Sequence, residues 1–116
     1  GFIMAYGTTA KILGDTKTYK LSTNVKRFPL RDAGFIESKG GKFQLERSLD
    51  PYSPFNQGYK LKVAIQADMK NFKMVTLTAN GMQEVNIFKG NDNQGNIEQL
   101  EFIINDLKER KILEEV

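Results

Sequence analysis

The stretch that decides the fold is NIEQLEFIINDLKER, residues 96–110. Its apolar residues recur with the 3.6-residue period of an α-helix, which places one aliphatic stripe along the helix. The stripe consists of Ile97, Leu100, Ile103, Ile104 and Leu107. The ends also favour a helix, because Asn96 is a suitable N-cap and basic residues lie near the C-terminal end. We therefore expect one long amphipathic helix that covers a hydrophobic core.

Phe102 does not belong to this stripe and projects from nearly the opposite side of the helix. If the helix continued unbroken, Leu113 and Val116 would lie on the same side as Phe102. The three residues are the candidate surface for a protein partner. Alternatively, residues 111–116 leave the helix and dock as a short tail.

Short β-prone segments separated by turn residues precede the helix. The predicted strands are 8–13, 17–21, 35–39, 42–49, 60–67, 74–79 and 82–88. Gly40-Gly41 and Asn80-Gly81 predict tight hairpins. Residues 22–32 predict a short helix or turn followed by a loop. Because Pro29 follows Phe28, a helical conformation is disfavoured at Phe28. The fold class is therefore α+β, with an N-terminal hairpin, an antiparallel meander and one C-terminal helix.

The composition excludes several common catalytic chemistries. The chain has 116 residues, which fits one domain over residues 1–116, and it contains no cysteine and no histidine. It therefore provides no thiolate nucleophile, no imidazole base and no Cys/His zinc site. Carboxylate, lysine, tyrosine or serine chemistry remains. We expect no metal and no cofactor, and we favour a role other than catalysis.

The sequence shows no sign of export or membrane insertion. No apolar run approaches the ~20 residues of a membrane span, and residues 1–4 are too short for the apolar core of a secretory signal. The absence of cysteine suits a reducing cytoplasm, which is the expected location. Met4 is the expected natural first residue, with Gly1 to Ile3 preceding it as an addition.

Charge is distributed unevenly, although the net charge is only +3. Residues 11–47 hold nine Lys and Arg against four Asp and Glu, whereas residues 96–116 hold six acids against three bases. Such an asymmetry can steer an anionic partner towards the basic part. The alternative is an ordinary solvated surface of mixed charge, because no run of Lys and Arg exceeds two residues.

The segment RSLDPYSPFNQGY, residues 47–59, is the main candidate for a ligand site. It is longer than a usual hairpin loop and concentrates aromatic, amide and charged side chains. Arg47 would hold a carboxylate or phosphate, the tyrosines would stack on a ring and the amides would bind polar edges. The candidate residues are Arg31, Arg47, Asp50, Tyr52, Asn56, Gln57 and Tyr59. The structural alternative is that Arg47 pairs with Asp50 while Phe55 fills the core.

Two further charged groups have similar ambiguity. Arg31 can add a charge to the same pocket, or Asp32 can satisfy a turn and pair with Arg31. Lys60 and Lys62 point to one side of a strand and can bind phosphate, or they simply keep the sheet soluble.

Other familiar sites are not supported by the sequence. Residues 90–96 are rich in Asn and Gly, but they lack the carboxylate spacing of a calcium loop and the Lys-Ser/Thr of a phosphate-binding loop. Tyr19-Lys20 and residues 59–62 give only a trace of the basic and aromatic pattern of nucleic-acid binders. We therefore expect no nucleic-acid partner and no membrane partner.

Five stretches carry a resemblance to a known family: residues 12–21, 30–35, 43–51, 78–81 and 85–89. Over nearly the whole chain from Met4, the sequence resembles a small bacterial family classed as domain of unknown function 1831 and labelled "putative amino acid metabolism". The resemblance implies sheets packed around one helix, with a remote similarity in shape to bacterial S-adenosylmethionine decarboxylases. It does not imply their activity, because those enzymes rely on a self-processed serine with supporting His and Cys.

Two functions from different classes follow. The first is a cytoplasmic binding or accessory protein of amino-acid metabolism, including sulfur amino-acid metabolism. It would hold an amino-acid-like or nucleoside-like ligand, or dock on a metabolic enzyme. The second is a small lyase or decarboxylase that uses Asp32 or Asp50 beside a lysine or tyrosine.

Overall fold

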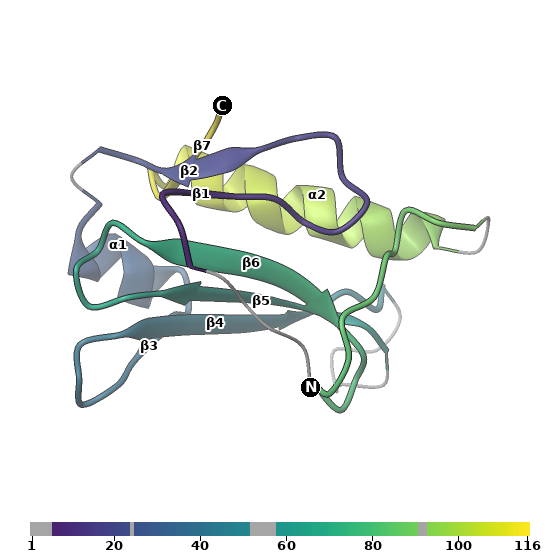
Figure 1. Cartoon of the computed structure of the whole chain (residues 1–116), viewed down its shortest axis with the longest axis horizontal. Coiled ribbons are helices and arrows are strands. Elements are labelled where there is room, and N and C mark those ends of the chain that lie inside the picture. Colours follow the sequence, from purple (N-terminus) through teal and green to yellow (C-terminus); the bar gives the residue numbers. More distant parts are fainter. Residues whose placement is uncertain (1–5, 24, 52–57, 91–92) are drawn as a thin grey trace.

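The computed structural model describes residues 6–23, 25–51, 58–90 and 93–116. In chain order its elements are β1 (Thr9–Ala10), β2 (Tyr19–Leu21), α1 (Arg27–Asp32), β3 (Ile36–Glu37), β4 (Phe43–Ser48), β5 (Lys60–Ile65), β6 (Phe72–Leu77), α2 (Gln94–Glu109) and β7 (Leu113–Glu115). These elements form two antiparallel sheets and a long C-terminal helix (Figure 1). The predicted α+β class is confirmed.

The larger sheet has the strand order β3-β4-β5-β6, with every neighbouring pair antiparallel. The register pairs Phe43 with Ile65 and Ser48 with Lys60, so β4 and β5 match along their whole length. Gly41 closes the β3–β4 hairpin at a φ of 85°, in the left-handed region that favours glycine. The connection is one residue longer than the predicted Gly40-Gly41 pair, because the Ser38 N–H donates to the Lys42 carbonyl oxygen.

The smaller sheet has the order β1-β2-β7 and unites the two ends of the chain. Pairing of β1 with β2 confirms the predicted N-terminal hairpin. The helix does not continue to Val116: Lys111 takes a φ of 63°, and the chain turns back to pair β7 with β2. Residues 113–115 thus dock as a tail.

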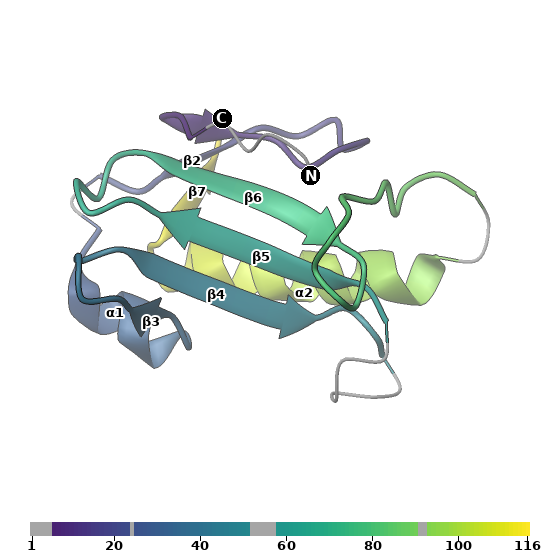
Figure 2. The same cartoon turned by 60° about the horizontal axis from the view of Figure 1, so that its bottom comes forward.

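The aliphatic stripe of α2 forms the centre of the core. Leu100, Ile103, Ile104 and Leu107 are buried, and Ile97 is partly buried. They belong to one cluster with side chains of both sheets, including Leu45, Val63, Met74, Tyr19 and Leu113. Figure 2 shows the larger sheet face-on with α2 behind it, and Figure 1 shows the smaller sheet beside the β6 edge and against the helix. One face of the larger sheet is therefore covered by the helix.

Two details of the helices differ from the predictions. α2 begins at Gln94, and the amide of Asn96 is not a cap but donates to the Leu49 carbonyl oxygen at 2.8 Å. α1 includes Phe28 and Pro29, contrary to the expected break at Phe28. Pro29 lies in the first turn, where its missing N–H costs no helical hydrogen bond.

The predicted strand over residues 82–88 is replaced by an isolated bridge between Leu77 and Glu84. The Asn80-Gly81 turn itself forms, with Gly81 at a φ of 76°. Beyond it, the Val85 N–H donates to the Thr76 carbonyl oxygen at 2.9 Å, and the Thr76 hydroxyl donates to the Val85 carbonyl oxygen at 2.6 Å. Ala67, predicted to face inward at the end of a longer strand, is exposed in the turn that follows β5.

No helix in the described ranges combines the length and hydropathy that crossing a membrane requires.

The packing of α2 generates a direct test with two substitutions on one helix. Leu100→Ala should lower the free energy of unfolding by about 2–5 kcal/mol, because Leu100 is 1% exposed and its truncation leaves a cavity. Phe102→Ala should change it by less than about 0.5 kcal/mol, because Phe102 is 64% exposed. Urea unfolding measures both, and equal losses would contradict this packing.

Candidate functional site

The described part of the predicted 47–59 site lies at the end of β4 nearest the start of α2. Arg47 is half-buried and paired with Leu61, and the Leu49 N–H donates to the Tyr59 carbonyl oxygen at 2.8 Å. Asp50 lies against Gly58. A Cβ on Gly95 would come within 2.8 Å of Pro51 Cγ, so this segment packs closely on the first turn of α2.

Arg47, Asp50 and Tyr59 thus all lie within two residues of the Leu49–Tyr59 hydrogen bond along the two paired segments. Tyr52, Phe55, Asn56 and Gln57 lie outside the described residues, so the binding roles predicted for the segment remain predictions.

Arg31 does not join this group. α1 lies at the opposite end of the larger sheet from the segment after β4, as Figures 1 and 2 show. Arg31 is instead hydrogen-bonded to Glu37, which Arg27 also approaches at 3.8 Å. The same arrangement separates Asp32 from Asp50, so the two carboxylates considered for lyase chemistry do not share a pocket.

The predicted partner surface on the helix is also divided. Phe102 and Val116 are 64% and 70% exposed, but Leu113 is 1% exposed because it faces the core from β7. Leu113 therefore cannot contribute to an exposed contact. The reason is the turn at Lys111, which ends the helix before Leu113.

In the described part of the Asn-rich segment around the start of α2, the amides make structural hydrogen bonds. Asn93 donates to the Lys89 carbonyl oxygen at 3.0 Å, in addition to the contact of Asn96 with Leu49. Within the described ranges, no group of three or more acidic side chains is placed to hold a metal ion.

A groove on the outer face of the larger sheet, opposite α2, is a candidate site. It has a volume of about 400 Å³. The residues that line it come from the N-terminal segment and from β3, β4, β5 and the β3–β4 turn: Tyr6, Gly34, Ile36, Ser38, Lys42, Phe43, Gln44, Glu46, Ala64 and Ile65. Its volume lies within the range of small-molecule sites.

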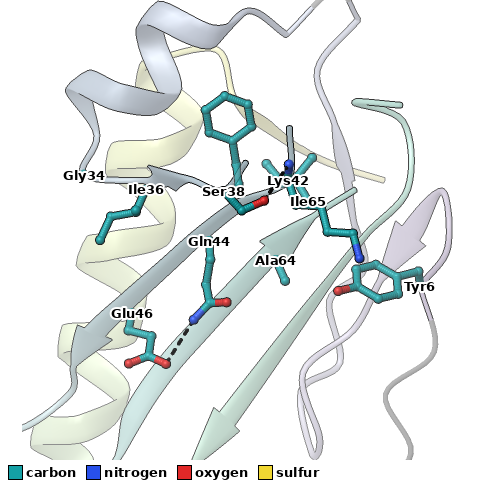
Figure 3. A pocket seen from close by; sticks show the side chains of 10 residues that line it. Tyr6, Gly34, Ile36, Ser38, Lys42, Gln44, Glu46, Ala64 and Ile65 are labelled. Atoms are coloured by element: carbon teal, nitrogen blue, oxygen red, sulfur yellow. Dashed lines mark hydrogen bonds between the residues drawn. The ribbon is translucent and has the colours of Figure 1, made fainter. Parts of the chain in front are cut away.

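The alternation of β4 creates the polar lining. Phe43 and Leu45 point into the core, so Gln44 and Glu46 point outward, and the register sets Gln44 opposite Ala64. The small Ala64 side chain leaves room between its longer neighbours. Figure 3 shows Ala64 between Gln44 and Tyr6.

The two ends of the groove carry opposite charges. In Figure 3 the Lys42 side chain extends toward the Tyr6 ring, whereas the Gln44 amide turns to Glu46. The Gln44 amide donates to Glu46 at 3.3 Å, and Lys60 pairs with the other oxygen of Glu46 at 3.2 Å. The groove therefore has the Lys42 ammonium at one end. At the other end lies the Glu46 carboxylate, which is held in place by contacts with Gln44 and Lys60.

Tyr6 is positioned by contacts that link distant parts of the sequence. Gly7 and Phe72 exchange two backbone hydrogen bonds, which brings the N-terminal segment to β6. The Lys73 ammonium lies 4.2 Å from the centre of the Tyr6 ring, within the range of a cation–π contact. The alternation of β4 can be predicted from the sequence, but the pairing of Gly7 with Phe72 cannot. The sequence therefore does not predict the groove.

Fold and groove together define a small α+β domain with a ligand-sized recess on an antiparallel sheet. The model of the DUF1831 family, described as "Putative amino acid metabolism", matches residues 4–114, and the chain belongs to this family.

The chain is also similar to a DUF1831 family protein from Lactobacillus plantarum, whose crystal structure was determined at 1.20 Å resolution. The two share 49% sequence identity with a TM-score of 0.89, over 97% of this chain and 99% of the other. Comparison with curated proteins gave no match.

The placement of Arg31 predicts a pH effect. The hydrogen bond from Arg31 and the nearby charges of Arg31 and Arg27 hold the pKa of Glu37 below its ordinary value. A lowered pKa stabilises the fold above the ordinary glutamate pKa of about 4.3, and this stabilisation is lost as pH falls through the lowered pKa. Glu37→Gln should therefore unfold at lower urea concentration than the parent at pH 7, and this difference should shrink at an acidic pH below the lowered pKa.

The contrasting substitution is Glu109→Gln on the exposed end of α2, which should leave the urea midpoint nearly unchanged at both pH values. A constant difference for Glu37→Gln across this pH range would exclude the ion pair as its cause.

Proposed function

We propose that the chain is a small-ligand-binding protein of amino-acid metabolism and that the ligand lies in the groove on the outer face of the larger sheet. The observation that carries this proposal is the pair of opposite charges, Lys42 and Glu46, at the two ends of one groove of about 400 Å³. A carboxylate would bind the Lys42 ammonium, and a cationic group would bind Glu46.

The spacing of the two residues selects the kind of amino acid. Lys42 and Glu46 are four residues apart along an extended chain, which separates their backbones by about 13 Å. The ammonium and carboxylate of a short α-amino acid are too close together to reach both ends. An elongated amino acid with a side-chain cation, such as lysine or arginine, matches the groove better.

Other features of the groove suit such a ligand. Ile36 is 76% exposed at its margin and offers an apolar contact for the aliphatic part. The side-chain oxygen of Gln44 is available for the α-ammonium group, since its nitrogen donates to Glu46. Recognition of this kind needs no cysteine or histidine, and the lack of cysteine fits the proposed cytoplasmic setting.

The family description supports amino-acid metabolism as the setting but does not state a reaction. Binding, either for storage and sensing or as an accessory to a metabolic enzyme, needs only the residues of the groove. The segment 47–59 remains the alternative location of the ligand, and Arg47→Ala distinguishes it from the groove.

Isothermal titration with L-lysine and L-arginine tests the proposal. The chain should bind at least one of them. Lys42→Met should weaken binding about tenfold or more, because a charge-assisted hydrogen bond to a carboxylate contributes about 1.5–3 kcal/mol. Lys89→Met removes the same charge from an exposed position outside the groove and should leave affinity unchanged.

Analogues of the ligand test the two-charge requirement. Norleucine lacks the side-chain cation and 1,5-diaminopentane lacks the carboxylate, so each should bind more weakly than lysine. Equal binding of lysine by the parent and by Lys42→Met, with loss in Arg47→Ala, would move the site to residues 47–59. No heat of binding with either amino acid would reject the ligand class.

A further inference from the structure

A second cavity, of about 260 Å³, lies on the helix side of the molecule between the turn before β2 and α2. Its apolar lining comes from Phe88 and from Ile97, Leu100 and Ile104 of α2. Its polar lining includes Asp15, Lys17 and Glu101. Two of the stretches that carry the family resemblance, residues 12–21 and 85–89, meet at this cavity. It is separate from the groove, which lies on the other face of the larger sheet.

The wall of this cavity is held in place by close backbone contacts. Gly14 has a φ of 84°, and a Cβ at this position would lie only 2.1 Å from Asn86 Oδ1. The same oxygen accepts a hydrogen bond from the Phe88 N–H at 2.9 Å. The Asp15 carboxylate accepts one from the Lys17 N–H at 3.1 Å. Both sides of the cavity are therefore ordered without a ligand, which lowers the entropic cost of binding.

Tyr19 adds an aromatic ring and a hydroxyl group to the lining of this cavity. The residue is only 2% exposed and lines the cavity, and the Lys108 ammonium lies 5.6 Å from the centre of its ring. Burial, followed by the charges of Asp15, Glu115 and Glu101, raises the pKa of Tyr19 to about 12. At neutral pH the hydroxyl is therefore protonated.

The charges near Tyr19 do not cancel at the cavity. Glu115 is hydrogen-bonded to Lys108 at 2.8 Å and does not line the cavity. Asp15 and Glu101 remain, against one cation, Lys17. The lining thus carries a net negative charge above an apolar floor.

We propose that this cavity binds a small primary alkylammonium ion, with the ammonium group at Asp15, Glu101 and the Tyr19 hydroxyl and the alkyl chain against Ile97 and Leu100. The apolar floor adds affinity through buried hydrocarbon, and the carboxylates select a cation over a neutral or anionic molecule of the same shape. The site does not depend on the function proposed for the groove.

The experiment is a titration of the ¹⁵N-labelled chain with n-butylammonium, followed by the backbone amide shifts. Saturable shifts should cluster at residues 15–19 and 97–104, and the isosteric anion pentanoate should not produce them. Glu101→Gln should weaken binding about threefold, whereas Lys17→Met should tighten it, because Lys17 competes with the ligand for the carboxylates. Tyr19→Phe should weaken it by removing the hydroxyl.

Two substitutions serve as matched controls. Glu109→Gln and Lys11→Met make the same charge changes at exposed positions outside the cavity and should leave the affinity unchanged. Equal weakening by Glu101→Gln and Glu109→Gln would overturn the proposal in favour of unspecific charge attraction. Absence of saturable shifts, equal shifts with pentanoate, or shifts confined to the sheet groove would also overturn it.

Discussion

The burial of the α2 stripe between two sheets is the interaction on which the rest of the structure depends. Leu100, Ile103 and Leu107 are each no more than 2% exposed, and a buried aliphatic side chain contributes about 1.5–3 kcal/mol. The direct backbone pairing of the N-terminal segment with the larger sheet is limited, in the described residues, to the Gly7–Phe72 bridge. The helix therefore couples the smaller sheet to the larger one, and the β7 tail that follows the helix completes this connection.

The position of α2 also decides which face of the larger sheet is left uncovered by the helix (Figure 2). The helix takes the inner face of the larger sheet, so the outward residues of β4 and β5 are left to form a surface of their own. On that surface Glu46 is braced by Lys60 and Gln44, and Ala64 leaves a recess between longer side chains. Because the strands are fixed by the core behind them, the backbone positions that carry the two charges of the groove are held in place.

The sequence was informative where structure follows from local periodicity. The 3.6-residue stripe of α2 and the alternation in β4 and β5 predicted the class of fold and the faces of these elements. It was not informative where distant segments meet. Arg47 lies near the end of β4, whereas Arg31 lies in α1 at the opposite end of the larger sheet, so they do not share a pocket (Figure 2). Leu113 was misplaced because one left-handed residue, Lys111, redirects the chain.

The groove on the larger sheet and the helix-side cavity differ in the charges of the residues that line them. Both form where parts of the chain that are far apart in sequence meet, and both combine an apolar surface with few polar groups. The groove separates a cation from a carboxylate, which favours a ligand that carries both charges. The helix-side cavity concentrates carboxylates near a protonated hydroxyl, which favours a cation alone. Since neither requires a nucleophile or a metal, recognition of small charged molecules is a function that a chain without cysteine and histidine can perform.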